Sequence, residues 1–364
     1  MQEPTSGTYQ DVLDAEVRRG RVPGISAAVV KGGHVAWAGA AGAADLSRGA
    51  PMTSDAVCNW FSMTKIATAT AAMQLADDGT LDIDAPVSRY LPYFSPVSPG
   101  GDVRVAHLLN HSSGLANPVP VRWVHPTGTR GPAPRDFLER LLARHKKLKF
   151  PPGERASYTN IGYLALGEVV AAASGHDYTD QARHTVLEPL GMEATDFDYT
   201  PSMRPLAAVG YQRLPRGLGP LLRVMLPAGI VDTRAGRFVG FHPFVLDGAA
   251  YGGLVGSAPD AARFAAAHLG HGEFEGVRVL SAETAARMQR IETFGRPFDV
   301  GLGWFRPHGT ADAPAFVEHL GGGAGFFNVM RLYPERAVAV VVMGNATKYD
   351  VDGVAAGLAR RAWS

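Results

Sequence analysis

The sequence predicts an α/β (α+β) fold, in which both ends of the chain build one mixed, mainly antiparallel sheet and a mostly helical region is inserted between them. Three observations lead to this prediction. Strand patterns lie at 25–40 and again after residue 300. The intervening segments carry helical patterns broken by Pro and Gly. The 364 residues, 46% of them hydrophobic, suffice to bury a large core.

The first elements are a helix, a strand pair and a second helix. Residues 10–20 have a short helical pattern. Two apolar runs, at 25–30 and 35–40, flank a Gly-Gly pair, which is a hairpin signal. The Ala-rich stretch 61–73 lacks Gly and Pro and is followed by Gly79, so we expect a buried helix there.

The middle of the chain is expected to be mostly helical. Residues 80–150 indicate short helical pieces separated by Pro and Gly. A second strong helix should follow Asn160 as its N-cap and end at Gly175. The stretch 203–250 has little periodicity, so we expect a long ordered loop that covers a site.

The last third of the chain returns to strand patterns. The expected strands cover 300–305, 316–320, 326–333 and 337–345, the last two form a hairpin through Tyr333-Pro334-Glu335-Arg336, and a final helix covers about 351–363. We therefore assign residues 1–78 and 250–364 to a sheet domain, and residues 79–249 to a helical region with long loops around the site.

Composition excludes several classes of protein. The 35 basic and 34 acidic residues leave a net charge of +1, which argues against a nucleic-acid partner. No window reaches the roughly eighteen apolar residues that a membrane span needs. Cys58 is the only cysteine, so no internal disulfide or Cys-based zinc site is expected. The polar start at 1–6 lacks a secretory pattern, so we expect a cytoplasmic protein unless a signal has been trimmed.

Common cofactor and metal motifs are missing from the sequence. There is no Gly-x-Ser-x-Gly, no His-Glu-x-x-His, no phosphate-binding Gly-x-x-x-x-Gly-Lys and no convincing dinucleotide fingerprint, so no cofactor is expected. His107 and His111 stand four residues apart and could share a metal ion on one helix face. A Ser-Ser-Gly turn follows at once, and no third ligand is evident. We therefore expect no metal site.

Ser62 and Lys65 are the first candidates for chemistry. Three positions along a helix return to the same face, so the Lys65 amine can reach the Ser62 hydroxyl. A serine hydroxyl needs an adjacent base to act as a nucleophile. A lysine that is partly desolvated can lose its proton near neutral pH and serve as that base. The alternative is a chance pairing of the two residue types.

Tyr158 and Asn160 precede the second strong helix. A phenol near a lysine can relay a proton to a leaving group. An asparagine amide can donate to a substrate carbonyl and accept from the lysine. The alternative is equally simple, with Asn160 as a helix cap and Tyr158 as a surface aromatic.

His319 begins the run His-Leu-Gly-Gly-Gly, which ends at Gly323 on a predicted strand. Glycines at such a position let a substrate approach the strand edge, and a backbone N–H can point at a developing oxyanion. The pattern His-x-Gly recurs at 268–270, but there it closes an amphipathic helix. The context therefore favours His319, and not the histidine at 268, as the candidate site residue.

Taken together, Ser62-x-x-Lys65, Tyr158-x-Asn160 and His319-x-Gly321 resemble the motifs of the serine β-lactamase and penicillin-binding-protein superfamily. The branch with the greatest similarity holds class C β-lactamases, D-aminopeptidase-like enzymes and β-lactamase-like (family VIII) carboxylesterases. Further segments that resemble this branch are 108–115, 152–163, 188–192, 252–255 and 301–304.

The resemblance implies a role for each motif residue. Ser62 would be the acylated nucleophile and Lys65 its base or partner. Tyr158 would relay protons, and Asn160 would orient the substrate and the lysine. The backbone N–H groups of Ser62 and Gly322 would form the oxyanion hole. The resemblance also implies a β-lactamase/transpeptidase-like fold, with the site where the sheet meets the helical region.

His319 departs from most of the superfamily, in which this position holds Lys. A fixed cation there helps to hold a substrate carboxylate, and a neutral histidine gives up much of that attraction at pH 7. The departure favours esters, amides or thioesters that lack an obligatory carboxylate.

The segment 212–248 interleaves apolar residues with arginines and lies between the second and third motifs. We expect either an apolar acyl pocket with a basic rim or a lid packed on the helical region. The residues concerned are Leu218, Leu221, Leu222, Val224, Met225, Leu226 and Ile230, with Arg213, Arg216, Arg223, Arg234 and Arg237.

The expected function is a serine hydrolase that works through an acyl-enzyme on Ser62, of carboxylesterase type and acting on small or medium acyl esters. Alternatives are a D-amino-acid peptidase or amidase, a weak β-lactamase, an acyltransferase or transesterase of natural-product assembly, and a catalytically silent binding module. The expected partner is a small ester, amide or thioester, and an acyl-carrier protein is a further candidate. No oligomeric state is predicted.

Overall fold

The computed structural model describes residues 8–215, 219–309 and 314–363. Its main element is an eight-stranded sheet in which every pair of neighbouring strands is antiparallel. In spatial order the strands are β14 (Phe298–Val300), β15 (Phe305–Pro307), β16 (Val317–Gly323), β17 (Phe326–Tyr333), β18 (Val338–Gly344), β1 (Gly24–Lys31), β2 (His34–Asp45) and β3 (Ala50–Pro51).

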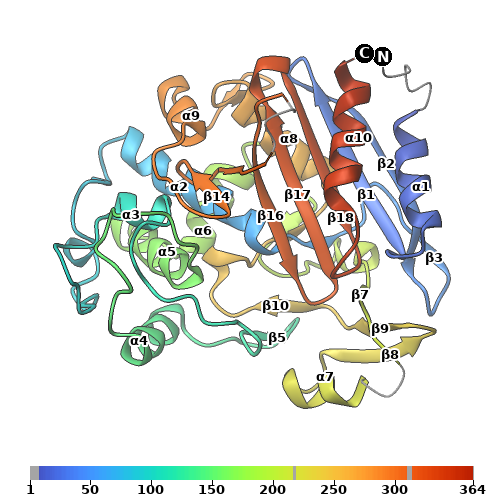
Figure 1. The fold of residues 1–364 in the computed structure, drawn as a ribbon, viewed down its shortest axis with the longest axis horizontal. Coiled ribbons are helices and arrows are strands. Elements are labelled where there is room, and N and C mark those ends of the chain that lie inside the picture. The colour runs from blue at the N-terminus through green and yellow to red at the C-terminus, as the bar shows by residue number, and fades with distance from the viewer. Residues whose placement is uncertain (1–7, 216–218, 310–313, 364) are drawn as a thin grey trace.

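Both ends of the chain contribute to this sheet, as the sequence predicts. Strand β1 pairs with β18, so that Ile25 lies opposite Gly344 and Lys31 opposite Val338. Figure 1 shows the blue N-terminal strands directly beside the red C-terminal ones. The fold class is therefore confirmed.

Helices cover both faces of the sheet. Along β1, alternate side chains point to opposite faces, which is the period of a strand. Ile25 and Val29 pack with the residues of α1 (Tyr9–Arg18) and α10 (Val351–Trp363) on one face. On the opposite face, Ala28 and Val30 join the main core, which also contains the apolar residues of α8 (Ala258–Leu269).

Most of the other helices lie beside the sheet, on the left of Figure 1, and one of them, α7 (Gly219–Met225), lies at its lower right. These other helices are α2 (Thr64–Asp77), α3 (Val105–Leu109), α4 (Pro134–Arg144), α5 (Asn160–Ser174), α6 (Tyr178–Ala182), α7 and α9 (Ala282–Gln289). Short helical turns are η1 (Phe61–Met63), η2 (Val87–Arg89), η3 (Arg183–Leu187), η4 (Arg204–Leu206), η5 (Ala249–Tyr251) and η6 (Pro334–Arg336).

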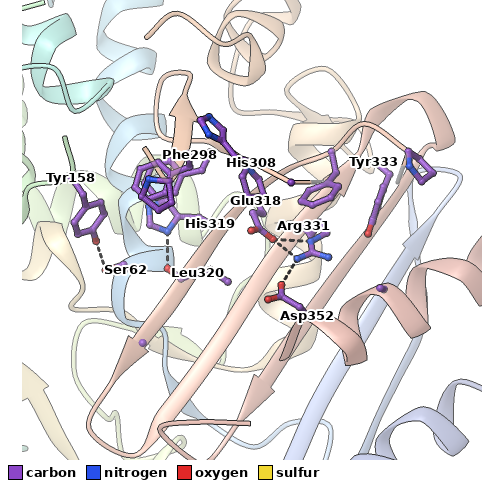
Figure 2. A pocket seen from close by; sticks show the side chains of 18 of the residues that line it. Ser62, Tyr158, Phe298, His308, Glu318, His319, Leu320, Arg331, Tyr333 and Asp352 are labelled. Carbon is purple, nitrogen blue, oxygen red and sulfur yellow. Dashed lines mark hydrogen bonds and ion pairs between the residues drawn. The ribbon is translucent and has the colours of Figure 1, made fainter. Parts of the chain in front are cut away.

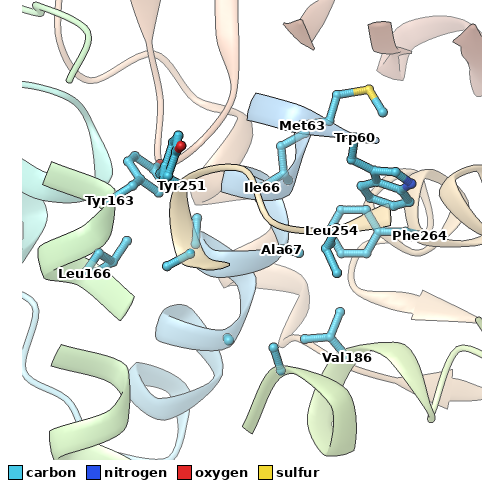
Figure 3. Packing of buried hydrophobic residues seen from close by; sticks show 14 of the residues in the cluster. Trp60, Met63, Ile66, Ala67, Tyr163, Leu166, Val186, Tyr251, Leu254 and Phe264 are labelled. Carbon is cyan, nitrogen blue, oxygen red and sulfur yellow. The ribbon is translucent and has the colours of Figure 1, made fainter. Parts of the chain in front are cut away.

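Helix α2 is the buried helix that the Ala-rich stretch predicts. Eleven of its fourteen residues are buried. Figure 3 shows Ile66 and Ala67 of this helix between Tyr163 of α5 on one side and Trp60 and Phe264 on the other. Because α2 is enclosed on all sides, a polar residue on it lies in a low-dielectric environment.

The stretch 203–250 contains more regular structure than the sequence indicates. Instead of one long loop, it holds α7 and strands of two small sheets, as Figure 1 shows at the lower right. These two sheets are β7 (Gly210–Arg213), β9 (Phe238–Phe241) and β8 (Val231–Ala235), and β10 (Phe244–Leu246) with β5 (Val124–Pro126). Two further small sheets have no strand in this stretch: β4 (Cys58–Asn59), β11 (Val255–Gly256) and β6 (Thr195–Asp196), and β12 (Glu273–Phe274) with β13 (Val277–Arg278).

Two further expectations are corrected. The predicted strand 300–305 is two strands, β14 and β15, with the turn 301–304 between them. The N-cap of α5 is Thr159, whose side chain accepts a hydrogen bond from the Gly162 N–H, and Asn160 is the first residue of the helix.

The division into a sheet domain (1–78 and 250–364) and a helical region (79–249) stays a prediction. Among the described residues, none of the helices has the length and apolarity to cross a membrane.

Candidate active site

Ser62 lies in the turn η1, directly before α2. The preceding residue, Phe61, has a φ of 49°, a left-handed conformation that is uncommon for a residue with a side chain. The turn is held from both sides. The Trp60 N–H donates to the Leu254 carbonyl over 2.8 Å, and a Cβ on Gly323 would lie 2.2 Å from the Phe61 ring. The start of the helix is therefore fixed against its neighbours.

The Ser62 hydroxyl has two polar partners. The Tyr158 phenol donates to Ser62 Oγ over 2.5 Å, as Figure 2 shows, and the Lys65 amine lies 3.2 Å from the same oxygen. The structure therefore brings together the three residues that the sequence singles out at 62, 65 and 158.

Lys65 is completely buried, with 0% of its surface exposed. Burial holds the pKa of its amine well below the usual value of 10.5. Besides Ser62, its Nζ has two oxygen partners, Asn160 Oδ1 at 2.9 Å and the Tyr251 carbonyl at 2.5 Å. Within the described parts of the chain, no carboxylate forms an ion pair with this amine. Burial is therefore what favours the neutral amine, against the oxygen acceptors and the tyrosine rings around Nζ.

Tyr158 packs against three aromatic rings, tilted by 35° to His111 and nearly perpendicular to Phe305 and Phe298. Its ring centroid lies 4.7 Å from that of His111, 6.0 Å from Phe305 and 6.4 Å from Phe298. Burial raises the pKa of the Tyr158 phenol above its usual value of 10, while the hydrogen bond to Ser62 acts in the opposite direction. The phenol therefore keeps its proton at neutral pH.

Asn160 begins α5 and faces the lysine. Its backbone N–H donates to Asn117 Oδ1 over 3.0 Å, and its side-chain oxygen accepts from Lys65. Because Thr159 caps the helix, the Asn160 amide is free to make this contact. Asn160 also lines a cavity beside Ser62.

His319, Gly321 and Gly322 lie on β16, near η1. Among the described residues, β15 pairs with β16 only at Glu318, and no other described strand covers the rest of this edge. A Cβ on Gly321 would lie 2.0 Å from the Trp60 carbonyl oxygen, so only glycine allows this approach. The glycine run thus places the strand edge directly beside the turn that carries Ser62.

The His319 side chain is neutral. It is 1% exposed, its Nδ1 is bonded to the Leu320 carbonyl over 2.7 Å, and its Nε2 is buried without a partner among the described residues. Burial, together with the nearby Lys65, lowers its pKa to about 3. Because a carbonyl only accepts, the imidazole proton sits on Nδ1.

Two cavities meet at Ser62 and Gly322, which line both. The larger is a cleft of about 1110 Å³. Figure 2 follows it from Tyr158 and Ser62, past His319, to Arg331 and Asp352. The smaller has about 320 Å³ and is mainly apolar, with Phe61, Val121, Val124, Leu226, Ile230, Phe244 and Leu246 among its lining residues.

The segment 212–248 contributes to the smaller cavity only in part. Leu226 and Ile230 line it, whereas Val224 and Met225 are exposed. Among the described residues, none of the arginines of this segment lines the cavity, so they form no basic rim there. Arg213, Arg234 and Arg237 instead line a separate cavity. Arg216 and Leu218 lie outside the described residues.

The contacts that three residues make with the site are not predicted from the sequence, although one of the three, His111, is considered there as a metal ligand. Tyr251 binds Lys65 through a backbone carbonyl, for which no side-chain pattern exists. His111 and Asn117 reach the segment around Tyr158 from a distant loop. His111 and His107 do not share a site, since each accepts a different backbone N–H through Nδ1. The described residues hold no group of three or more His, Cys, Asp or Glu that could bind a metal ion.

Comparison with known proteins places the chain in one family. The family model described as Beta-lactamase matches residues 9–362. Penicillin-binding protein 4 of Amycolatopsis lactamdurans is 30% identical over 94% of this chain and 87% of its own length. Esterase EstB of Burkholderia gladioli is 33% identical over 69% of this chain and 67% of its own.

Solved structures agree with this fold. The D-amino acid amidase of Ochrobactrum anthropi SV3 superposes with a TM-score of 0.78 at 24% identity, over 97% of this chain and 96% of the amidase chain. At that identity the match concerns the fold alone. Together with the family model and the two relatives, it leads to one conclusion: the chain belongs to the beta-lactamase family of serine hydrolases.

Proposed function

We propose that this enzyme cleaves small or medium acyl esters through an acyl-enzyme formed on Ser62, as a carboxylesterase does. One observation carries the proposal: the Ser62 hydroxyl lies between a buried amine and a partly buried phenol, 3.2 Å from Lys65 Nζ and 2.5 Å from the Tyr158 oxygen. A nucleophile with a base on one side and an acid on the other can take part in both halves of acyl transfer.

Lys65 is the proposed base. In its neutral form the amine has two N–H donors and one lone pair. The two carbonyl-type oxygens beside it, on Asn160 and Tyr251, can only accept, so they take the two donors. The lone pair is then left for the Ser62 O–H. This count supports proton transfer from Ser62 to Lys65 as the hydroxyl attacks the substrate carbonyl.

Tyr158 is the proposed acid in acylation. Its phenol is protonated and already donates to Ser62 Oγ. When Ser62 attacks, the phenol can turn to the departing alkoxide and give it a proton. In the second half-reaction the same oxygen can take a proton from the incoming water, by microscopic reversibility. The tyrosine therefore relays protons in both directions, as the family resemblance also implies.

The oxyanion would be held by backbone N–H groups of Ser62 and Gly322. This assignment rests on the resemblance and on the position of both residues at the junction of the two cavities. Asn160 would orient the substrate carbonyl and Lys65 from the same side.

The substrate proposal rests on the polarity of the site. The 320 Å³ cavity beside Ser62 is lined mainly by apolar side chains, and its size is near the lower end for small-molecule pockets. It suits an acyl group without charge. The neutral His319, where most relatives of the superfamily have Lys, offers no fixed cation for a carboxylate. Both features favour a plain ester over a β-lactam.

The larger cleft supports acyl transfer as a second candidate activity. It reaches Ser62 from another side and has about 1110 Å³, enough for an acceptor alcohol or amine beside the acyl-enzyme. Product analysis with added alcohols or amines separates transfer from hydrolysis. Nitrocefin turnover at rates that match those of an aryl ester would instead favour the amidase, peptidase or β-lactamase alternatives.

The first test is hydrolysis of p-nitrophenyl butyrate by the wild type and by Ser62→Ala. Turnover by the wild type alone is expected, and equal turnover by both would refute the proposal.

The acyl pocket is tested with Leu226→Trp, which should shift the preference toward shorter acyl chains by about tenfold, on the usual scale of one or two methylene groups. Val224→Trp is the matched control, because Val224 is 75% exposed and does not line the pocket. An unchanged chain-length preference in Leu226→Trp would exclude the pocket.

A further inference from the structure

Tyr158 lies in a segment that has few backbone partners of its own. Tyr158 belongs to the short segment 157–159, which has no regular secondary structure. Before it, Ala156 pairs with Gly295, and after it α5 begins at Asn160. The backbone on either side of Tyr158 therefore needs partners from elsewhere in the chain.

His111 supplies these partners on both sides. Its carbonyl accepts from the Ser157 N–H over 2.8 Å, and its Nδ1 accepts from the Thr159 N–H over 3.2 Å. Between these two bonds its ring lies against the Tyr158 ring, with 4.7 Å between centroids. One residue thus contacts the residue before Tyr158, Tyr158 itself and the residue after it.

The backbone of His111 is strained in a way that serves this arrangement. Its φ is 57°, in the left-handed region, although histidine carries a side chain. The described residues include four other such positions, and of these only Phe61 is next to a candidate site residue. Such conformations persist only where the surroundings fix them. His111 is fully buried, which provides that constraint.

The protonation state of His111 also fits the contact. Burial, together with Lys65 and His319, holds its pKa well below the usual 6.5, so the ring is neutral. Because Nδ1 accepts a hydrogen bond, the proton of the neutral ring sits on Nε2. A residue without an acceptor at this position would leave the N–H of Thr159, itself 0% exposed, without its partner.

We infer that His111 is a positioning residue, which holds the Tyr158 hydroxyl at hydrogen-bond distance from Ser62. The inference rests on the proposed function, since it assigns the role through Tyr158. It predicts that changes at His111 affect the rate of the chemical step more than substrate binding.

A double-mutant cycle tests this inference, with p-nitrophenyl butyrate as substrate. His111→Phe keeps a ring and removes the acceptor, so it should lower kcat by about ten- to a hundredfold while KM changes by less than about threefold. In the Tyr158→Phe background the same change should lower kcat by less than about twofold, because the hydroxyl to be positioned is already gone. Equal losses in both backgrounds, or wild-type kcat in His111→Phe, would overturn the inference.

Two further variants separate positioning from folding. His111→Asn keeps an acceptor oxygen and tolerates the left-handed conformation, so it should retain most of kcat even if its Tm falls. If His111→Phe does not fold, a kcat for His111→Asn as low as that of Tyr158→Phe would refute the role of the acceptor. His107→Phe is the matched control, because His107 Nδ1 accepts from Arg104, away from Tyr158. If the single variant Tyr158→Phe turned over the ester at the wild-type rate, the result would instead refute the role of Tyr158 in the proposed function.

Discussion

Replacing Tyr158 by Phe removes a single oxygen atom and keeps the ring that packs on His111 and Phe305. The lost hydroxyl donates to Ser62 Oγ over 2.5 Å and is the proposed proton donor to the leaving group. Loss of a positioned acid–base group lowers rates by about 10²–10⁴. At about 1.4 kcal/mol for each factor of ten, the barrier rises by about 3–6 kcal/mol.

The same substitution should leave binding and folding nearly unchanged. Substrate contacts come from cavities that many other residues line, so KM should stay within about threefold of the wild type. Ser62 keeps Lys65 as a partner, so the loss of one hydrogen bond should lower the free energy of unfolding by at most about 1.5 kcal/mol. The expected result is therefore a large fall in kcat without a matching fall in Tm.

The assay is steady-state hydrolysis of p-nitrophenyl butyrate, with a thermal melt of each variant. Tyr163→Phe is the matched control. Tyr163 is also fully buried near Lys65, but its hydroxyl donates to the Leu109 carbonyl over 2.9 Å and does not contact Ser62. Its kcat should remain within a few-fold of the wild type. If Tyr158→Phe turns over the ester at the wild-type rate, the acid role is refuted and Tyr158 is only a packing residue.

Three other variants probe the rest of the site. Ser62→Ala should form no acyl adduct, detected by intact mass after incubation with ester; an adduct on this variant would identify another nucleophile. Lys65→Met should lose activity. The difference in Tm, variant minus wild type, should decrease between pH 7 and pH 10. The reason is that the pKa of Lys65 is lowered on folding, so the wild type gains stability as pH rises toward 10.5; a difference independent of pH would contradict this. Gly321→Ala should lower kcat by about a hundredfold or more, since its Cβ would lie 2.0 Å from the Trp60 carbonyl, whereas Gly100→Ala, with no atom nearer than 3.6 Å, should behave as wild type.

The motifs could be recognised in the sequence because each lies on an element with a strong local signal or directly before one. The composition of α2 favours a helix, and the compositions of β16 to β18 favour strands. Three spaced motifs were therefore enough to predict the fold class, and the structure brings Ser62, Lys65 and Tyr158 together.

The remaining details depend on contacts between distant segments. Thr159 and Asn160 are both good N-cap residues, and the contact between Asn160 and Lys65 decides which of them caps α5. The short strands within 203–250 pair with partners that local periodicity does not reveal. The contacts of His111 likewise cross more than forty residues of chain and leave no pattern in the sequence.

The pairing of β1 with β18 has a consequence for how the chain is made. Ile25 leaves the ribosome about 320 residues before its partner Gly344. At about 5–20 residues per second, the apolar hairpin of β1 and β2 waits about 15–60 s for the strand that completes the sheet. During that time its unpaired edge is open to association with other chains. We therefore expect the yield of native protein to depend on chaperones and to fall when synthesis is slowed, and nascent chains that stop before β18 to aggregate.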